Sequence, residues 1–258
     1  MQGDKFMEKK EKYVCLKGVC FGILFCIFII PVFLVLQKGV WEDGIFTWKW
    51  YREVFLLNPV YLKKFWESFF LTLILTAGQM GIGILAAFGI SVYELPGRRV
   101  IEKILLLLLL LPIQVLLVPQ YIVLDRLNLL NTVWALVLPY CVLPFSTFFL
   151  LLFFKRTDRE VLDAARLDGA GSGTLLVKIV IPVEKKPVTA LSVLVFLYAW
   201  SMVEQPMVFF ENPALYPLSV YLFTAPEGEW GKLSPCGLLS MIPILILAGI
   251  FLKGREER

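Results

Sequence analysis

Six uncharged, strongly apolar runs divide this sequence of 258 residues, and they constrain its fold more than any other feature. The hydrocarbon core of a bilayer is about 30 Å thick, so a helix of about 20 apolar residues crosses it. A helix also satisfies its own backbone hydrogen bonds where no water is present. The runs are Gly18–Leu36, Ser68–Tyr93, Ile104–Leu124, Thr132–Phe154, Pro187–Val203 and Leu233–Leu252. They predict an all-α integral membrane protein with six transmembrane helices.

Two of these runs need comment. Pro187–Val203 is short, with 17 residues, and Gln205–Phe210 would extend it past Glu204. The first run is long and is not followed by a small-residue cleavage site, so we expect an uncleaved anchor rather than a signal peptide.

Composition agrees with a membrane protein and argues against an enzyme. Hydrophobic residues make up 59% of the chain and charged residues only 18%, below the globular average of about 25%. The sequence has no His, and its five Cys residues lack metal-site spacing, so common general bases and metal ligands are missing. No Asp or Glu pair lies within an apolar run. We therefore predict no catalytic residue and no metal site.

The positive residues predict the orientation, because loops rich in Lys and Arg stay on the cytoplasmic side. With the N-terminus inside, segments 1–17, 94–103, 155–186 and 253–258 hold eighteen of the 25 Lys and Arg residues. The seven Trp residues fall in or beside the outer segments, where indole rings are favoured at the interface. The predicted topology is N-in and C-in. It accounts for the net charge of +4 without a nucleic-acid partner.

The polar side chains within the runs are neutral. A transporter that uses an ion gradient usually keeps ionisable residues inside its helices, so we expect either a passive channel or a translocator driven by another protein. The polar residues can hold helices together or line a path for a neutral, hydroxyl-rich solute. The candidates for that path are Gln79, Gln114, Tyr140, Ser146, Tyr198 and Ser201.

The longest inner loop contains a glycine-rich stretch, DAARLDGAGSGTLLVKIVIP at positions 163–182. It lacks the Gly-Lys-Ser/Thr ending of a phosphate-binding loop, because Gly173 is followed by Thr174 and Leu175. Its glycine spacing also differs from that of a dinucleotide fingerprint. Nucleotide binding by this loop is therefore not expected.

The loop instead predicts two short helices. Helix-forming residues fill 159–167, and Asp168-Gly169 ends that helix through a glycine with a positive φ. A second helix starts at Ser172 or Thr174 and runs to Ile181, where Pro182 ends or kinks it.

The first of these helices is amphipathic. Leu162, Ala165 and Leu167 are expected to form a small apolar patch on it. Such a helix fits a groove on another protein. The alternative, a helix lying on the membrane, is disfavoured by Asp163 and Asp168 at an anionic inner leaflet.

The loop resembles the EAA loop of ABC importer permeases in Asp163-Ala164-Ala165, Asp168-Gly169-Ala170 and Ile179-x-Ile181-Pro182. The form with Asp-Gly-Ala is similar to the carbohydrate-uptake branch, the second-permease type of the maltose and glycerol-phosphate systems. Resemblance extends over residues 65–250. Supporting motifs are Ala86-Ala87-Phe88, Leu95-Pro96-Gly97-Arg98, Leu129-Leu130-Asn131-Thr132, and Trp200 with Pro206.

The sequence also departs from the family pattern. Asp163 replaces the leading Glu, Asp158 the Pro before the loop, and Leu176 a Phe. Ser201 stands where the family has Asn after the tryptophan. The C-terminal tail is shorter than in the family.

The resemblance implies a type I ABC importer permease fold, with residues 1–67 as a cytoplasmic tail, first helix and external segment. Residues 68–258 would form a five-helix core with the coupling loop 155–187. Such a chain sits in the bacterial cytoplasmic membrane and forms, with a second permease, the path for a sugar, oligosaccharide or related polyol. The alternative is a subunit of a passive channel for a small polar solute.

The implied partners are the second permease, two ATP-binding cassette subunits and an extracytoplasmic solute-binding protein. This chain would bind no cofactor, because ATP-Mg is used by the ATPase subunits. The implied contacts with the ATPase are Glu160, Asp163, Ala164, Ala165, Asp168, Gly169, Ala170, Leu176 and Pro182.

The outer segment 204–232 is acidic and contains four prolines. We expect an irregular excursion rather than one long helix, packed by Phe209, Phe210, Tyr216 and Tyr221. It is either a solvated connector or, as the resemblance implies, the docking surface for the binding protein. The candidate docking residues are Glu227 and Glu229.

Overall fold

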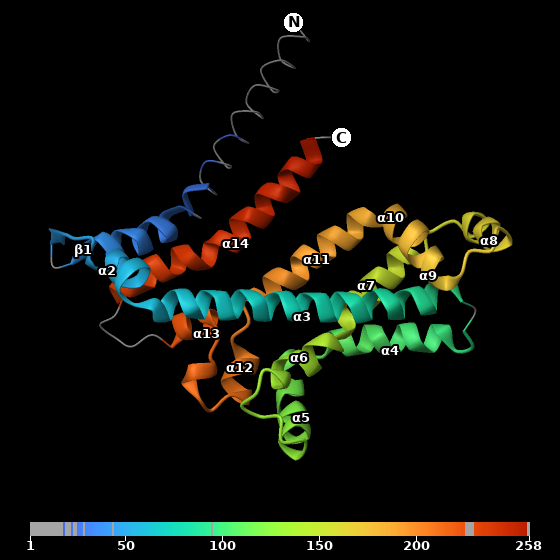
Figure 1. Cartoon of the computed structure of the whole chain (residues 1–258), viewed down its shortest axis with the longest axis horizontal. Helices are drawn as coiled ribbons and strands as arrows, with labels where there is room; N and C mark the ends of the chain where they lie inside the picture. The colour runs from blue at the N-terminus through green and yellow to red at the C-terminus, as the bar shows by residue number, and fades with distance from the viewer. Residues whose placement is uncertain are drawn as a thin grey trace, which may run out of the picture. The chain divides into compact units, whose positions relative to one another are not determined.

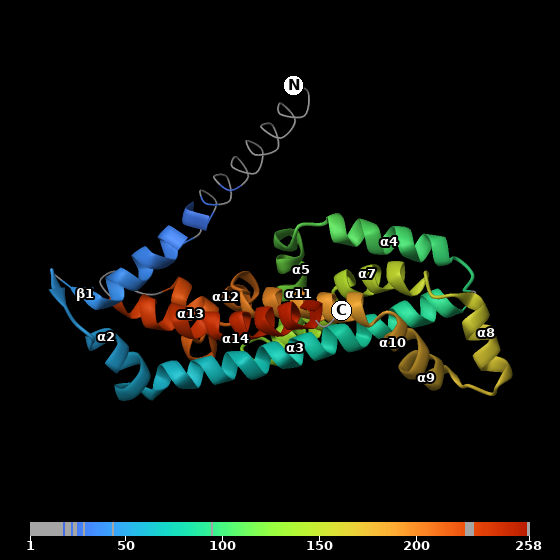
Figure 2. The same cartoon turned by 90° about the horizontal axis from the view of Figure 1, so that it is seen from above.

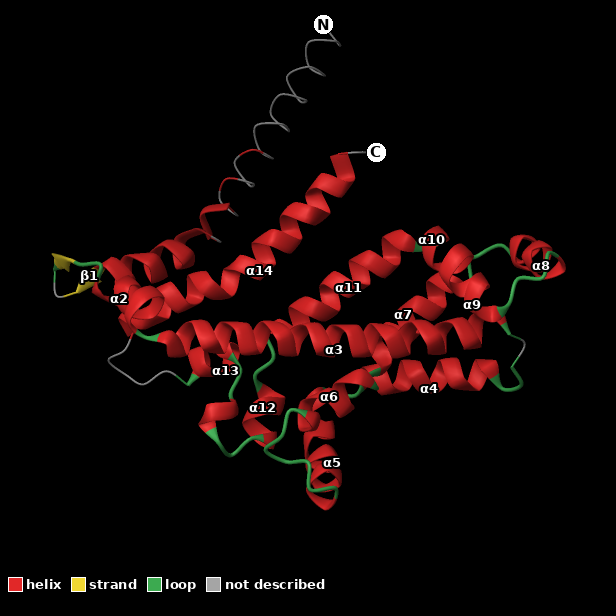
Figure 3. Ribbon diagram, in the orientation of Figure 1, coloured by secondary structure: helices red, strands yellow, loops and turns green. Residues whose placement is uncertain are grey.

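Helices dominate the protein, as predicted. The computed structural model describes residues 29–42, 44–93, 95–224 and 230–256, together with residues 18, 22 and 25–27. Within these residues the only strands are β1 (Trp41–Glu42) and β2 (Ile45–Phe46), two residues each, and Figure 3 shows them as a small hairpin beside many helices. They pair antiparallel, Trp41 opposite Phe46, across a turn in which Gly44 has a φ of 81°.

The chain divides into two compact units. The first contains residues 1–62 and 225–241; besides the hairpin it includes α2 (Lys49–Arg52), a π-helical turn (Glu53–Leu57) and the start of α14 (Trp230–Glu256). Tyr51 and Ser234 are hydrogen-bonded there at 2.9 Å, and Lys232 pairs with Glu53 at 3.0 Å.

The second unit contains residues 63–224 and 242–258, and it holds the polar loop. Its core elements are α3 (Pro59–Val92), α4 (Arg98–Leu110), α5 (Ile113–Arg126), α6 (Trp134–Cys141), α7 (Pro144–Phe154) and α11 (Lys185–Trp200). Its loop elements are α8 (Arg159–Leu167), α9 (Ser172–Thr174), a π-helix (Leu175–Val180) and α10 (Ile181–Val183). The outer elements are α12 (Glu204–Phe209), a 3₁₀ turn (Pro213–Leu215) and α13 (Leu218–Phe223).

Three helical segments are long and apolar enough to cross a membrane: Pro59–Val92, Trp134–Phe154 and Gly231–Ile250. The pair α4 and α5 makes a fourth if it counts as one span. The described helices therefore meet the requirements of three or four spans, where the sequence predicts six.

The predicted third span is broken. Between α4 and α5 the chain turns by 101°, which Figure 1 shows as the departure of α5 from the line of α4. Leu111 and Pro112 are both extended, with ψ of 124° and 141°. Proline disfavours the helical conformation in the residue before it and cannot donate a backbone hydrogen bond, so a single helix over Ile104–Leu124 does not form.

The fourth run is also interrupted, and the fifth ends before its predicted extension. Leu143 before Pro144 is extended, with ψ of 133°, and separates α6 from α7 for the same reason. The fifth run forms α11, and the predicted extension past Glu204 is a separate helix, α12.

Small residues bring α6 and α7 into close contact with α3. A Cβ on Gly83 would lie 2.3 Å from the Ser146 hydroxyl oxygen, and one on Gly78 would lie 2.2 Å from the sulfur of Cys141. Helices in membranes pack tightly where such small residues meet. The helix α7 also packs against α4, which runs beside it in Figure 2, so α7 contacts both α3 and α4.

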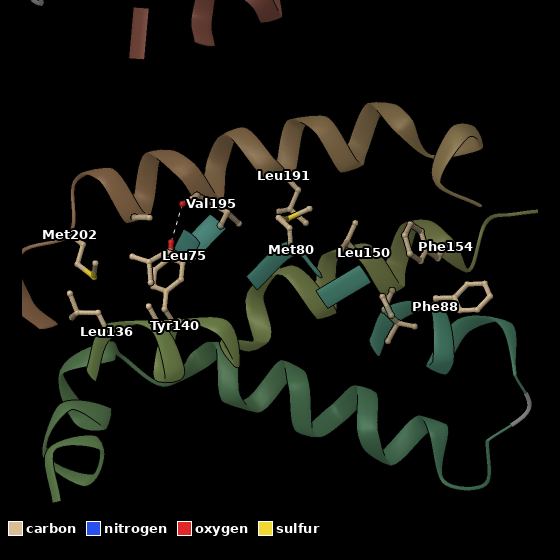
Figure 4. Close-up of a cluster of buried hydrophobic side chains, with 14 of the residues drawn as sticks. Leu75, Met80, Phe88, Leu136, Tyr140, Leu150, Phe154, Leu191, Val195 and Met202 are labelled. Carbon is tan, nitrogen blue, oxygen red and sulfur yellow. Dashed lines mark hydrogen bonds between the residues drawn. The ribbon is translucent and has the colours of Figure 1, made fainter. Parts of the chain in front are cut away.

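The core of the second unit is formed by side chains from α3, α6, α7 and α11, as Figure 4 shows. Leu75, Leu150 and Val195 are among its fully buried members. The same core extends to the loop elements, because Leu162, Leu175 and Val180 belong to it. The polar loop is therefore packed on the helices and is not a separate appendage.

Candidate functional site

The predicted first helix of the loop is confirmed with its predicted bounds, and both of its ends are capped. Asp158 accepts a hydrogen bond from the Glu160 N–H at 3.0 Å, as an N-cap aspartate does. Thus the Asp that replaces the family Pro begins the helix. At the other end Gly169 has a φ of 85°, as predicted. The N–H groups of Gly169 and Ala170 donate to the carbonyls of Arg166 and Ala165 at 3.0 and 2.9 Å, which is a Schellman motif.

The predicted apolar patch on this helix is wrong. Leu162 is 4% exposed and packs in the core with Ala165 beside it, whereas Leu167 is 90% exposed. Residues five apart on a helix lie about 140° apart, so Leu162 and Leu167 point to different sides. The exposed apolar residues are Val161, Ala164 and Leu167.

The residues predicted to contact the ATPase lie around these three apolar side chains and differ in exposure. Glu160, Asp163, Asp168 and Gly169 are exposed, as is Ala164. Ala165 and Ala170 are half-buried. The helix thus presents an apolar strip of small and medium side chains with carboxylates on its borders.

One arginine ties the helix to the end of α3. Arg166 pairs with Asp163 at 2.8 Å, donates to the carbonyl of Val92 at 3.3 Å, and lies 5.9 Å from the centre of the Tyr93 ring. The Tyr93 hydroxyl in turn meets the hydroxyl of Ser172. A single residue after α3 therefore contacts both sides of the Gly169 turn, which the sequence did not indicate.

The second helical stretch runs from Ser172 to Val183 and starts where predicted. It does not end at Pro182, which lies inside α10; the regular helix is interrupted at Glu184. The turn before the proline is π-helical, a local adjustment that accompanies helix irregularities. Leu176 is buried in the core, whereas Pro182 is exposed.

Only part of the candidate solute path is brought together. Gln79, Tyr140 and Tyr198 line one cavity of about 460 Å³, with the two tyrosine rings stacked at 6.1 Å. The other lining side chains are apolar, and most of them are leucines. They lie on or beside α4, α5, α6, α7 and α11. Gln79 is 2% exposed, and its side-chain oxygen has no partner among the described residues.

The other three candidates lie apart from this cavity. Ser146 donates to the Gln79 carbonyl at 3.0 Å, and Ser201 donates to Leu197 on its own helix at 2.8 Å. Gln114 donates to the carboxylate of Glu204 at 2.9 Å.

Ser146 and Tyr140 act as contacts between helices. Tyr140 donates to the Val195 carbonyl at 2.9 Å, drawn as a dashed line in Figure 4. The Ser146 bond likewise joins α7 to α3. For these two residues the structure shows the helix-packing role that the sequence left open.

The outer segment is an irregular excursion up to Thr224, as predicted, with Phe209 and Phe210 buried. Asn131 and Lys64 are among the residues that hold it. Asn131, with a φ of 60°, accepts from the Glu211 N–H at 2.6 Å, and buried Lys64 donates to the carbonyls of Ala214 and Tyr216. The sequence indicated this role of Lys64 only through its positive charge, which lies in a predicted external segment. Glu227 and Glu229 lie outside the described residues.

In the part of the chain that the structure describes, no group of three His, Cys, Asp or Glu residues is placed to hold a metal ion.

Residues 79–253 match the family model of the binding-protein-dependent transport system inner membrane component. The chain is 33% identical over 209 residues to the sulfoquinovosyl glycerol transport system permease protein SmoH of Agrobacterium fabrum, covering 78% of this chain and 72% of that protein. It is 25% identical over 237 residues to the sn-glycerol-3-phosphate transport system permease protein UgpE of Yersinia enterocolitica, covering 88% and 84%.

The fold is shared with a solved structure of a bacterial ABC transporter involved in the import of the acidic polysaccharide alginate. The TM-score is 0.80 at 18% identity, and the match covers 93% of this chain and 95% of that one. A second structure, of the alginate ABC transporter in complex with a pentasaccharide-bound periplasmic protein, matches with a TM-score of 0.67 at 14% identity over 92% of each chain.

The matched family consists of transmembrane permease components of importers and not of enzymes. Its members lie in the inner membrane, in agreement with the several apolar helices of this protein. The chain therefore belongs to the family of binding-protein-dependent transport system inner membrane components, the permeases of ABC importers.

Proposed function

We propose that this chain is one of two permease subunits that form the pathway of an ATP-driven importer for a sugar, oligosaccharide or related polyol. The names of its relatives support this solute class, because they include two glycerol derivatives and the polysaccharide alginate. The neutral polar side chains Gln79, Tyr140 and Tyr198 at one cavity also support it, since amide and hydroxyl groups can replace the hydrogen bonds of a hydroxyl-rich solute.

The remaining subunits of this importer are a second permease, two ATPase subunits that use ATP-Mg, and an extracytoplasmic binding protein. The neighbouring alginate transporter was solved with a periplasmic protein, which supports the last of these. The chain itself holds no cofactor. Glu227 and Glu229, in the acidic outer segment, are the proposed docking residues for the binding protein.

The proposed topology has six spans with both termini inside. It divides the chain into an N-terminal part, 1–67, and a five-helix core, 68–258. The distribution of Lys and Arg supports it. The breaks at prolines are compatible with it, since broken helices cross membranes when neighbouring helices satisfy their backbone groups.

The observation that carries the coupling proposal is the exposed face of α8. Ala164 and the 90% exposed Leu167 lie on it, while the opposite face is buried in the core through Leu162. A capped helix with one face anchored transmits a push on its other face to the helices behind it. We assign this face, with Glu160, Asp163 and Asp168 on its borders, as the contact for the ATPase.

The test is a charge placed on this face. Leu167→Glu is expected to abolish co-purification of the ATPase subunits and solute-stimulated ATP hydrolysis, because a buried unpaired carboxylate is strongly unfavourable in an interface. Leu127→Glu is the matched control, since Leu127 is a leucine with 58% exposure in the turn after α5. Equal ATPase binding by both variants would remove α8 as the contact.

A further inference from the structure

The family motif Leu129-Leu130-Asn131-Thr132 lies in the turn that joins α5 to α6. Two asparagines in this turn have a left-handed backbone, Asn128 with a φ of 54° and Asn131 with a φ of 60°. A positive φ is unfavourable for most residues other than glycine, and asparagine is among the few that tolerate it. Each of the two positions therefore needs a physical reason.

Asn128 is explained by the helix that it ends. Its N–H donates to the carbonyl of Asp125, and the N–H of Leu129 donates to that of Leu124, both at 2.9 Å. These two bonds close the last turn of α5 as a Schellman motif, in which the left-handed residue belongs at this place. The cause of this conformation is local.

Asn131 is explained instead by a contact at the end of α12, 80 positions along the chain, which Figure 1 shows beside α5 and α6. Its side-chain oxygen accepts from the backbone N–H of Glu211 at 2.6 Å and from that of Asn212 at 3.4 Å. Its own N–H donates to the carbonyl of Phe209 at 3.1 Å. A glycine would adopt the same backbone without strain but has no oxygen to accept these bonds. The asparagine therefore serves segment 209–212.

The turn Glu211–Ala214 is held from its other side as well. Lys64, which is 7% exposed, donates to the carbonyls of Ala214 and Tyr216. The side chain of Asn212 accepts from the Ala214 N–H at 2.9 Å, and the proline between these two residues has a fixed φ. The turn is thus tied down on both sides, yet all four of its residues are exposed.

An exposed turn that is fixed in this way is suited to binding another protein. Binding residues are concentrated on loops that a rigid scaffold positions, and a surface that is already ordered loses less conformational entropy when it binds. With the orientation proposed above, the turn lies on the extracytoplasmic side of the membrane. The partner on that side is the solute-binding protein.

We propose that Asn131 is a positioning residue for transport, which holds the turn Glu211–Ala214 in the conformation that the extracytoplasmic binding protein contacts. This inference rests on the proposed importer function and adds a docking contact to Glu227 and Glu229. The exposed carboxylate of Glu211 belongs to the same acidic outer segment, so we expect a basic side chain opposite it on the binding protein. The motif around Asn131 thereby acts on a loop far along the chain.

The test measures ATP hydrolysis by the complete importer in lipid nanodiscs against the concentration of its purified binding protein. Asn131→Gly keeps the left-handed backbone and removes the acceptor oxygen. It should raise the half-saturating concentration of binding protein about tenfold, because the hydrogen bonds that order the turn are lost, and leave the maximal rate unchanged. Asn131→Asp keeps an acceptor and tolerates the same φ. It should stay within about threefold of the unaltered chain, since one exposed charge contributes little.

Asn128→Gly is the matched control. It makes the same change at the other left-handed asparagine, which does not contact segment 209–212 through its side chain, and it should leave the half-saturating concentration unchanged. A lower maximal rate in Asn131→Gly with an unchanged half-saturating concentration would mean a structural role only and overturns the proposal. An equal rise in both glycine variants overturns it too.

Photocrosslinking tests the contact itself. A benzophenone side chain at Glu211 should crosslink to the binding protein, and the crosslink should weaken when Asn131→Gly is added. The same group at Leu85, which is 63% exposed on α3 within a predicted span, should give none. Absence of the crosslink from position 211 rules out this turn as a contact. If the binding protein does not stimulate even the unaltered importer, the proposed function is wrong; if it does and Asn131→Gly responds identically, only this inference is wrong.

Discussion

The hydroxyl oxygens of Tyr93 and Ser172 lie 2.5 Å apart and join the end of α3 to the start of α9. Arg166 reaches the same tyrosine from α8, at 5.9 Å from its ring centre. The turn at Gly169 lies between Arg166 and Ser172, so both of its sides contact Tyr93, the residue directly after α3. The helix α8 is thereby attached to the end of α3 as well as to the core, which it enters through Leu162.

Removing this hydroxyl pair is expected to loosen coupling without unfolding the protein. Tyr93→Phe and Ser172→Ala should each raise the ATP hydrolysed per solute imported, and the double variant should add little to either single one. The coupling energy in that cycle is expected at about 0.5–1.5 kcal/mol. It is measured by thermal unfolding of the three variants, and additive effects would mean that the two hydroxyls act independently.

The turn at Gly169 requires a glycine. Gly169→Val is expected to cost about 1–3 kcal/mol, because φ of 85° is strained for a β-branched side chain. The variant should still insert in the membrane but lose ATPase association or transport. Gly171→Val is the matched control, since Gly171 has φ of −74° and ψ of 168°, which valine adopts readily. Normal transport by Gly169→Val would contradict this prediction.

The contact between α3 and α7 requires Gly83. Gly83→Ala should destabilise the protein by about 1–3 kcal/mol, because its Cβ would overlap the Ser146 hydroxyl and approach backbone at 3.2 Å. Gly81→Ala, on the same helix with open space around its Cβ, should be neutral or stabilising. Thermal unfolding of the two variants in one detergent checks the difference, and equal stability of the two variants would contradict the contact at Gly83.

Glu184 predicts a pH dependence of stability. Burial raises the pKa of this carboxyl above its usual value, against a smaller opposite effect of Arg156. The folded protein then binds a proton more tightly than the unfolded chain, so stability falls as pH rises through the unfolded pKa and reaches its lower level above the folded pKa. Glu184→Gln should remove this fall. The stability gain of the variant should therefore grow from about pH 4 upward, and a gain that is the same at pH 4 and pH 7.5 contradicts the assignment.

The proposed orientation is tested by labelling single cysteines in a background without native Cys. Lys178→Cys and Lys185→Cys should react only after the membrane is permeabilised, whereas Trp48→Cys should react in intact cells. The two lysines lie in the segment predicted inside, and the tryptophan lies in a segment predicted outside. Labelling of position 178 from outside reverses the topology and with it the coupling proposal.

Much of the helical framework could be predicted because its causes are local. Long uncharged runs leave a chain little choice but helix in a bilayer, and α3 and α14 follow two of these runs closely. The bounds of α8 follow from Asp158 and Gly169, which act on the residues next to them. Motif spacing in the polar loop likewise identified the family without a structure.

Other features depend on what each element packs against. Pro112 and Pro144 were visible in the sequence, yet a proline can kink a membrane helix, end it or be absorbed in it, and the 101° turn after α4 reflects the neighbours of that helix. The fate of Leu162 and Leu167 was likewise undecided, because either side of a short amphipathic helix can face the core. Only the packed structure buries the first and exposes the second.

The sequence by itself thus determined a helical membrane permease with a turn at Gly169, since hydrophobicity, capping and glycine geometry act over a few residues. The tertiary structure decided which polar groups meet. Tyr93 and Ser172 are separated by 79 positions, and Asn131 and Glu211 by 80. Such pairs form only when distant helices pack, because no local preference specifies a partner so far along the chain.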